Sequence, residues 1–347
     1  MRHINLIVLL ILFETNIGFS QPDEQNHTTN FPINEWKIVD NVADFGWSDK
    51  RLKIVEEYFD FIGSQSLMII ENGNLIASFG DLEKKFRIYS MRKSLLGMLY
   101  GCYIDSTIIL SATLSDYRID DIHPSLEGVE KDATIKDLLT STSGIYHKAA
   151  STDNKPPKRF SHQPGEYFYY NNWDFNALGT IFRERTGNDI FEDFNNKIAI
   201  PIGMQDYNWT KDHEYRYIKE SLHPAYHFDM TARDLARFGL LIQNNGVWKD
   251  KRIIPEKWIF ESTTSKIKVT NEQEKGSYGY LWWIIDSDAI WKMTGFPENS
   301  FYAYGNWSQY IFIIPSKDLL IVHRGYKKNI SYDKLILLFD LILRAKE

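Results

Sequence analysis

The chain has 347 residues, of which 43% are hydrophobic and 15% aromatic, and this is enough to bury a large core. Its formal net charge is -6 and no run of Lys or Arg stands out, which argues against a nucleic-acid partner. The single cysteine, Cys102, excludes an intramolecular disulfide. It lies in an apolar stretch, where we expect a buried small side chain and not a nucleophile.

The first twenty residues have the pattern of an export signal. Arg2 and His3 give a basic start, a mostly apolar run follows over residues 4–13, and small residues at Gly18 and Ser20 suit a signal peptidase. The apolar run is too short to span a bilayer, which needs about 20 residues. We predict a signal peptide over 1–20, a polar leader over 21–45 and an exported, periplasmic or secreted protein with no stable membrane span after cleavage. The alternative is an uncleaved membrane segment.

Periodicity then predicts the elements in chain order. A helix begins near Ser48, with an apolar stripe and Gly63 as its end, and Asn72-Gly73 joins two apolar runs as a hairpin. The middle of the chain, roughly 91–270, is expected to be mostly helices and loops, for example over 90–103, 135–141 and 230–243. Strands return over 301–304, 310–315 and 319–323, and a last helix covers 332–346.

Strands at both ends with a helical middle indicate an α+β fold. We expect one domain over 46–347, with an antiparallel sheet built from both chain ends, flanking helices and a mostly helical inserted subdomain over roughly 95–290.

The first candidate for chemistry is Ser90-Met91-Arg92-Lys93. If Ser90 opens a helix, Lys93 lies one turn later on the same face, where a neutral amine can activate the hydroxyl. Ser-x-x-Lys also occurs at Ser265 and Ser331, but only Ser90 follows a strand-like stretch and precedes an apolar helix. The competing interpretation is that Ser90 only caps the helix.

Two further segments present polar groups after turn signals. Pro164-Gly165 precedes a run in which Tyr169-x-Asn171 and Tyr170-x-Asn172 both fit a Tyr-x-Asn pattern, so the register is open. A tyrosine beside a lysine can pass protons, although such a run is more often core. Near the end, Gly305 allows close approach of a substrate backbone, and the backbone N–H of Asn306 is a candidate oxyanion donor. A plain turn is the alternative there.

In this order the segments resemble the class C β-lactamase-related serine hydrolases, a family that includes penicillin-binding proteins, D-aminopeptidase-like enzymes, esterases and 6-aminohexanoate-dimer hydrolases. The likeness covers roughly residues 45–345. It rests on the segments at 90–93, 138–145, 164–179, 230–239, 278–283 and 301–315, the last being nearest the dimer-hydrolase branch. The resemblance implies a β-lactamase/transpeptidase-like fold and places the second motif at Tyr170 and Asn172.

The same resemblance implies a role for each site residue. Ser90 would be acylated, Lys93 and Tyr170 would share general base and acid work, and Asn172 would orient the substrate or Lys93. The backbone N–H groups of Ser90 and Asn306, next to Gly305, would form the oxyanion hole. No metal or organic cofactor is implied, and the substrate would be a small amide, ester or peptide.

The chain departs from the family at several positions. Ala303-Tyr304-Gly305 stands where Lys-Thr-Gly or His-x-Gly is common, so the cation that helps hold a substrate carboxylate is missing and efficient β-lactam hydrolysis is in doubt. Ser141 replaces a common His and Asn171 a common Ser. Sequons at Asn26, Asn208, Asn306 and Asn329 are interpreted as chance matches, because a glycan on Asn306 would block the site.

Three functions follow for testing. The first is a hydrolase of small amides or esters, the second a D-Ala-D-Ala carboxypeptidase, penicillin-binding protein or β-lactamase with the same machinery, and the third a catalytically silent binding module.

Overall fold

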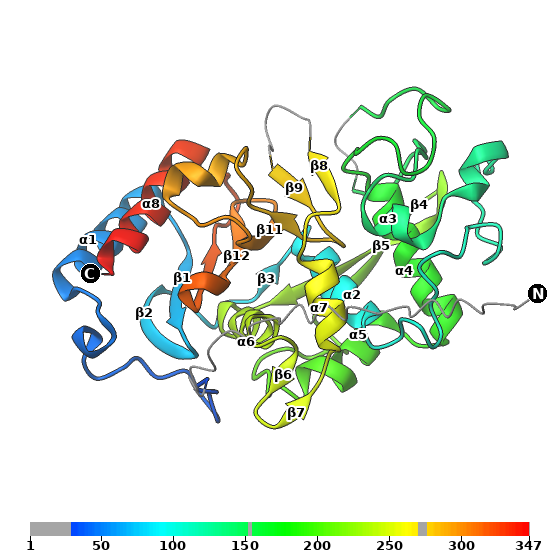
Figure 1. The fold of residues 1–347 in the computed structure, drawn as a ribbon. Coiled ribbons are helices and arrows are strands. Elements are labelled where there is room, and N and C mark those ends of the chain that lie inside the picture. The colour runs from blue at the N-terminus through cyan, green and yellow to red at the C-terminus, as the bar shows by residue number, and fades with distance from the viewer. Residues whose placement is uncertain (1–28, 152–154, 270–275, 347) are drawn as a thin grey trace, which may run out of the picture.

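A large antiparallel sheet is the centre of the computed structural model, which describes residues 29–151, 155–269 and 276–346. The strand order is β2-β1-β13-β12-β11-β10-β9-β8 (Figure 1). The strands are β1 (Ser66–Glu71), β2 (Asn74–Gly80), β8 (Ile267–Val269), β9 (Gly276–Tyr278), β10 (Trp283–Ile284), β11 (Phe301–Gly305), β12 (Gln309–Ile314) and β13 (Leu319–Arg324). Because β1 pairs directly with β13, the sheet joins the two ends of the chain, as predicted.

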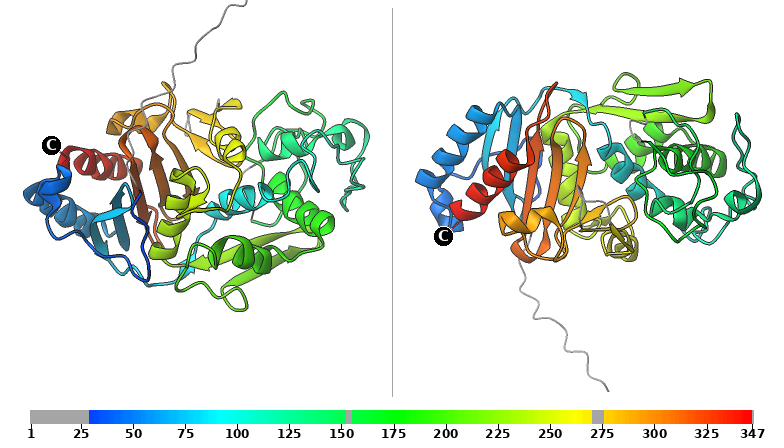
Figure 2. Two further views of the ribbon diagram at one scale, coloured as in Figure 1. Left: turned by 60° about the horizontal axis from the view of Figure 1, so that its bottom comes forward. Right: turned by 90° about the horizontal axis from the view of Figure 1, so that it is seen from above.

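Helices cover both faces of this sheet (Figure 2). On one face α1 (Asp49–Ile62) packs against α8 (Tyr332–Ala345), and on the other α6 (Ala232–Gln243) lies against β12 and β13. Strand β12 is buried along its whole length: Ile311 and Ile313 belong to the core beneath α6, and Phe312 to the core beneath α1 and α8. Side chains alternate between the faces of a strand, so a continuous apolar run is what a sheet covered on both sides requires.

The local signals at the start of the chain are confirmed. Helix α1 ends at Gly63, which takes the left-handed conformation with φ 76°. The β1–β2 hairpin turns at Asn72 and Gly73, whose φ values of 47° and 76° are those that an Asn-Gly turn supplies. The first described residues run along the body of the fold: the Trp36 indole donates to the carbonyl of Arg233. The predicted signal peptide lies outside the described residues.

A second layer lies beside the sheet and holds most of the remaining helices (Figures 1 and 2). The helices are α2 (Met91–Tyr100), α3 (Ile135–Leu139), α4 (Asn172–Thr186), α5 (Ile190–Phe194) and α7 (Glu256–Ser262). Short 3-10 or π turns cover Val42–Phe45, Gly128–Asp132, Asn195–Ala199, Ile290–Thr294 and Pro315–Lys317. Two small sheets accompany them, β3 (Phe86–Arg87), β5 (Ser221–Met230) and β4 (His213–Ile218) in the order β3-β5-β4, and β6 (Val247–Trp248) with β7 (Lys251–Arg252).

The helical insertion is narrower than the expected range of roughly 95–290, because several strands lie within that range. Residues 213–230 form the β4–β5 hairpin, α6 covers the main sheet, and β8, β9 and β10 are strands of that sheet. The physical reason is that β4 is only partly buried and that β8, β9 and β10 are two or three residues long, so none of them shows a clear two-residue apolar alternation.

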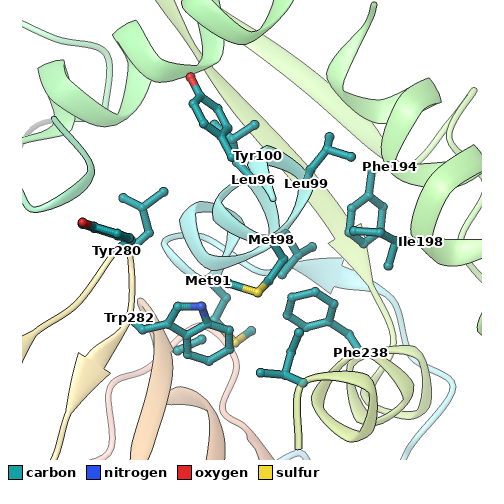
Figure 3. Packing of buried hydrophobic residues seen from close by; sticks show 14 of the residues in the cluster. Met91, Leu96, Met98, Leu99, Tyr100, Phe194, Ile198, Phe238, Tyr280 and Trp282 are labelled. Carbon is teal, nitrogen blue, oxygen red and sulfur yellow. The ribbon is translucent and has the colours of Figure 1, made fainter. Parts of the chain in front are cut away.

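Helix α2 is the most deeply buried helix of the second layer, with all of its residues buried. Figure 3 shows Met91, Leu96, Met98 and Leu99 within a cluster that includes Phe194, Ile198, Phe238, Tyr280 and Trp282. The Trp258 indole donates to the carbonyl of Gly97 at 2.8 Å, and the Tyr100 hydroxyl to that of Leu178 at 2.6 Å. A helix packed on all sides has little freedom to move, which fixes the position of residues at its N-terminus.

Beyond this helix, Cys102 is half-buried, and burial raises the pKa of its thiol to about 11. Within the part of the chain that is described, no helix combines the length and the apolar character needed to cross a bilayer.

Candidate active site

Ser90 stands at the junction between β3 and α2. The preceding residue, Tyr89, has φ 51°, a left-handed conformation that is unusual for an aromatic residue and turns the chain sharply into the helix. Ser90 occupies the N-cap position, but its side chain makes no capping hydrogen bond. Its Oγ instead accepts a hydrogen bond from Lys93 Nζ at 2.8 Å. The hydroxyl therefore does not serve the capping role that was the competing interpretation of this serine.

Lys93 joins two hydroxyl groups in one chain of hydrogen bonds. Its Nζ donates to Ser90 Oγ and to the Tyr170 hydroxyl, each at 2.8 Å, and lies 4.5 Å from the centre of the Phe175 ring. The side chain is buried, with a relative exposure of 1%. Burial disfavours the charged form of an amine, and this is the condition under which a lysine accepts a proton from a serine hydroxyl.

The structure resolves the register of the tyrosine pair. The hydroxyl of Tyr170 contacts Lys93, and its ring packs 5.3 Å from that of Trp283. Tyr169 turns toward Tyr146, at 5.6 Å between ring centres, and its buried hydroxyl has no hydrogen-bond partner within the described residues. The structure thus brings Tyr170, and not Tyr169, beside Lys93.

Ser141 holds the backbone on both sides of Tyr170. Its Oγ donates to the carbonyl of Tyr169 at 2.7 Å and accepts from the N–H of Asn171 at 2.9 Å. A Ser at this family position thus positions the tyrosine through the main chain. Asn171, the other departure from the family pattern, caps α4 by accepting from the N–H of Trp173 and donates to the buried carboxyl of Asp174 at 2.8 Å. Burial holds the pKa of Asp174 well above its usual range.

The predicted oxyanion donors come from two different elements. A Cβ on Gly305, the last residue of β11, would lie 2.2 Å from the carbonyl oxygen of Ile88, so only glycine allows β11 to approach the segment ahead of Ser90 this closely. Among the described residues, neither the N–H of Ser90 nor that of Asn306 has a hydrogen-bond acceptor. Both residues line the same pocket.

Two buried side chains missed at the sequence level hold this arrangement. Gln309 donates to the carbonyls of Arg87 and Asn306 at 2.9 and 3.0 Å. Arg324 in turn donates to Gln309 Oε1 at 2.7 Å and to the carbonyls of Met230 and Phe86. Burial lowers the pKa of Arg324 to about 9. These bonds tie the main sheet to β3 and β5, and the only available signal was a lone Arg in an apolar strand.

A pocket of about 350 Å³ opens at Ser90. Its lining also includes Tyr170 and Asn172, whose side-chain amide donates to the carbonyl of Ser151 at 2.8 Å. The remaining polar lining was not predicted: Arg87, Arg92, Arg216, His227 and Ser151. Burial lowers the pKa of His227 to about 2, and the neighbouring basic side chains of Arg92, Arg87, Lys93 and Arg216 add to this effect.

The predicted site residues therefore fall into two groups. Ser90, Lys93 and Tyr170 form one hydrogen-bonded chain, while Asn172 and Asn306 border the pocket with Ser90, and Gly305 lies just behind them. Within residues 29–151, 155–269 and 276–346, no group of three or more His, Cys, Asp or Glu side chains could hold a metal ion. The arrangement can perform acyl transfer, because a nucleophile, a proton acceptor and candidate oxyanion donors surround one cavity.

Comparison with known proteins agrees with this fold. The β-lactamase family model matches residues 56–323, so the chain belongs to this family, whose members are generally serine hydrolases. An uncharacterised protein of Alkalihalophilus pseudofirmus is 23% identical over 307 residues, which cover 78% of this chain and 86% of that protein.

Solved structures show the same fold. A putative 6-aminohexanoate-dimer hydrolase from Bacillus anthracis aligns with a TM-score of 0.64 at 19% identity, covering 92% of this chain and 89% of that one. A penicillin-binding protein homologue from Caulobacter crescentus aligns with a TM-score of 0.65 at 14% identity, covering 86% and 99%. The β-lactamase/transpeptidase-like fold expected from the sequence is thereby confirmed.

Proposed function

We propose that this member of the β-lactamase family hydrolyses a small amide or ester through an acyl-enzyme formed on Ser90. The observation that carries the proposal is the chain of two 2.8 Å hydrogen bonds from Ser90 Oγ through Lys93 Nζ to the Tyr170 hydroxyl, at the edge of a pocket. A serine hydroxyl needs an adjacent base to become a nucleophile, and this lysine is placed to be one.

The reaction would proceed in two halves. As Ser90 Oγ bonds to the substrate's carbonyl carbon, its proton passes to the Lys93–Tyr170 pair, and the N–H groups of Ser90 and Asn306 stabilise the resulting oxyanion. The pair then gives the proton to the leaving nitrogen or oxygen as its bond to carbon breaks. In the second half, water bonds to the acyl carbon while the same pair removes one of its protons. The bond between that carbon and Ser90 Oγ then breaks, and the pair returns the proton to Ser90 Oγ as the acid product leaves. Lys93 and Tyr170 share the base and acid roles.

Labelling and turnover test this proposal directly. Wild-type protein should hydrolyse p-nitrophenyl esters and react with a fluorophosphonate probe, and Ser90→Ala should abolish both. Ser265→Ala is the matched control, because Ser265 belongs to another Ser-x-x-Lys sequence and is exposed on the surface. Undiminished labelling of Ser90→Ala would refute the proposal. Failure of the wild type to label, or to turn over a wide panel of esters and amides, would favour a silent binding module.

A cell-wall peptidase or β-lactamase is the second candidate, since it would use the same serine. Ala303 stands where the family often places a cation, and Tyr304 beside it lines the pocket without supplying one. The missing cation weighs against β-lactams as preferred substrates. Stable acylation of Ser90 by labelled penicillin, seen as a mass increase on the intact chain, would favour the peptidase, and rapid release of that label the β-lactamase.

Export is part of the proposal. The basic start, apolar run and small residues over 1–20 support a cleaved signal peptide and a periplasmic or secreted enzyme. N-terminal sequencing of the mature protein tests it: a start near residue 21 is expected, and an intact Met1 in the envelope fraction would indicate an uncleaved membrane segment.

A further inference from the structure

One wall of the pocket is a face of the small β3-β5-β4 sheet. In this sheet Arg87 lies opposite Asp229, Glu214 opposite His227, and Arg216 opposite Ala225. Residues opposite each other in an antiparallel pair share a face, and so do residues two apart along a strand. Arg87, His227 and Arg216 therefore project from one face, and all three line the pocket that opens at Ser90.

The cations of this wall differ in how they are compensated. Arg87 forms ion pairs with Glu214 at 2.5 Å and with Asp229 at 3.4 Å, so two carboxylates of the protein compensate its positive charge. Arg216 forms no ion pair or side-chain hydrogen bond with any described residue. No acidic side chain lines the pocket itself within the described part of the chain.

Arg92 completes the set from the first turn of α2. It is buried to a relative exposure of 1%, donates to the side-chain carbonyl of Asn176 at 2.8 Å, and lies 4.3 Å above the ring of Tyr226. Among the described residues no carboxylate pairs with it, and its Nη1 atom has no hydrogen-bond acceptor. Burial lowers the pKa of Arg92, yet a guanidinium stays protonated in proteins.

A buried cation without a counter-ion is costly, and a pocket lined by charges of one sign attracts ligands of the opposite sign. The neighbouring imidazole does not add to the positive charge, because the pKa of His227 lies near 2. It is neutral at physiological pH, and its buried Nδ1 atom also lacks a partner in the described structure. A neutral imidazole beside two guanidinium groups can contribute one more hydrogen bond to an anion.

We propose that Arg92 and Arg216, with His227 beside them, bind a carboxylate of the substrate, so that the enzyme prefers esters or amides that carry a second, free acid group. This inference rests on the proposed hydrolysis at Ser90 and specifies its substrate class. The third motif, Ala303-Tyr304-Gly305, supplies no cation, and the anion site therefore lies on α2 and the β4–β5 hairpin instead. Guanidinium groups suit this role because their paired N–H donors match the two oxygens of a carboxylate.

Matched ester pairs test the preference. Mono-p-nitrophenyl succinate, glutarate and adipate carry a carboxylate in the acyl part, and p-nitrophenyl butyrate, valerate and hexanoate are neutral controls of similar size. A second pair varies the leaving group: the butyrate ester of 4-hydroxybenzoate carries a carboxylate there, and the butyrate ester of phenol is its neutral control. For one of these pairs, kcat/KM of the wild type should be at least about tenfold higher for the anionic member, and the pair that shows this locates the carboxylate.

Variants of the exposed Arg216 then tie the preference to this wall. Arg216→Ala should lower the ratio of anionic to neutral kcat/KM about tenfold or more through KM, and Arg216→Lys should restore part of it. Lys219→Ala, which removes an exposed cation near the turn of the same hairpin, should leave the ratio unchanged. Circular dichroism melting curves verify that each variant is folded.

The outcomes separate the two proposals. If wild-type protein hydrolyses neutral esters as well as it does half-acids, or if Arg216→Ala lowers both equally, the carboxylate site is wrong while the hydrolase stands. If no ester of either kind is cleaved and Ser90 is not labelled, the proposed function itself has failed.

Discussion

The two walls of the pocket are built in opposite ways. On the catalytic wall, Ser90, Lys93 and Tyr170 bond to one another, and Ser141 holds the tyrosine backbone from both sides. The hairpin wall consists of Arg216 and His227 of the β4–β5 hairpin together with Arg92 of α2. Among the described residues, Arg216 has no ion pair or side-chain hydrogen bond and Arg92 pairs with no carboxylate. The side chains of the first wall bond to one another, whereas those of the second include hydrogen-bond donors that have no acceptor among the described residues. We infer that one wall supplies the chemistry and the other selects the molecule on which it acts.

The largest expected effect comes from removing the centre of the catalytic wall. Lys93→Met keeps an unbranched apolar side chain in the buried position but removes the amine between the two hydroxyls. Because general base catalysis contributes about 10²–10⁴-fold, kcat on p-nitrophenyl esters should fall by about that factor. Single-turnover acylation measured by mass spectrometry checks this, and a lysine variant that acylates at the wild-type rate would leave Ser90 without its assigned base.

A smaller loss of kcat is expected when the phenol hydroxyl of Tyr170 is removed. Tyr170→Phe retains the ring contact with Trp283 but loses the hydroxyl that touches Lys93, and kcat should fall about 10²-fold. Tyr169→Phe is the matched control: it removes a neighbouring hydroxyl that has no hydrogen-bond partner in the described structure, and turnover should stay within about twofold of wild type. Equal losses in both variants would contradict the register seen here.

The smallest effect is expected from replacing His227 on the hairpin wall, and it concerns the pH dependence of the free energy of unfolding. His227 has a folded pKa of about 2 against an ordinary value near 6.5, so between these pH values the unfolded chain binds a proton that the folded protein does not. Wild-type stability should therefore fall as the pH drops below about 6.5, and His227→Gln should remove this contribution. From pH 7 to pH 4.5, the free energy of unfolding of His227→Gln should rise by about 2.5 kcal/mol relative to that of the wild type.

Urea unfolding across that pH range provides the measurement for His227. Tyr217→Phe, which changes an exposed side chain of the same hairpin, serves as control and should follow the wild-type curve. A His227→Gln curve parallel to that of the wild type would mean that this imidazole titrates normally, and the cationic character of the wall would then be overestimated.

The predictable parts of the fold were those with local signals. Asn72-Gly73 sets a turn by itself, Gly63 ends a helix, and the strand at 319–323 opens on four consecutive apolar residues. The β4–β5 hairpin was missed because its first strand carries no local strand signal. Residues His213 to Ile218 show no clear alternation of apolar and polar side chains, since the strand is only partly buried.

The site shows the same division. Ser90 and Lys93 are three residues apart on one helix, so their contact follows from helix geometry, whereas Tyr170 needed the family pattern to settle its register. Arg216 and His227 could not be assigned, because their meeting with Arg92 depends on the packing of a hairpin against a helix more than 100 residues earlier. Spacing in the sequence carries no information on contacts of this kind.

The lone thiol has a practical consequence. Cys102 is half-buried, and at neutral pH a group with a pKa of about 11 is almost entirely protonated, whereas alkylating reagents attack the thiolate. The native chain should thus react very slowly with maleimides. A cysteine introduced at the exposed position 219, near the turn of the β4–β5 hairpin, would then be readily modified while Arg216 is kept. A spectroscopic tag there would report ligand-induced changes in the hairpin without further mutation of the background.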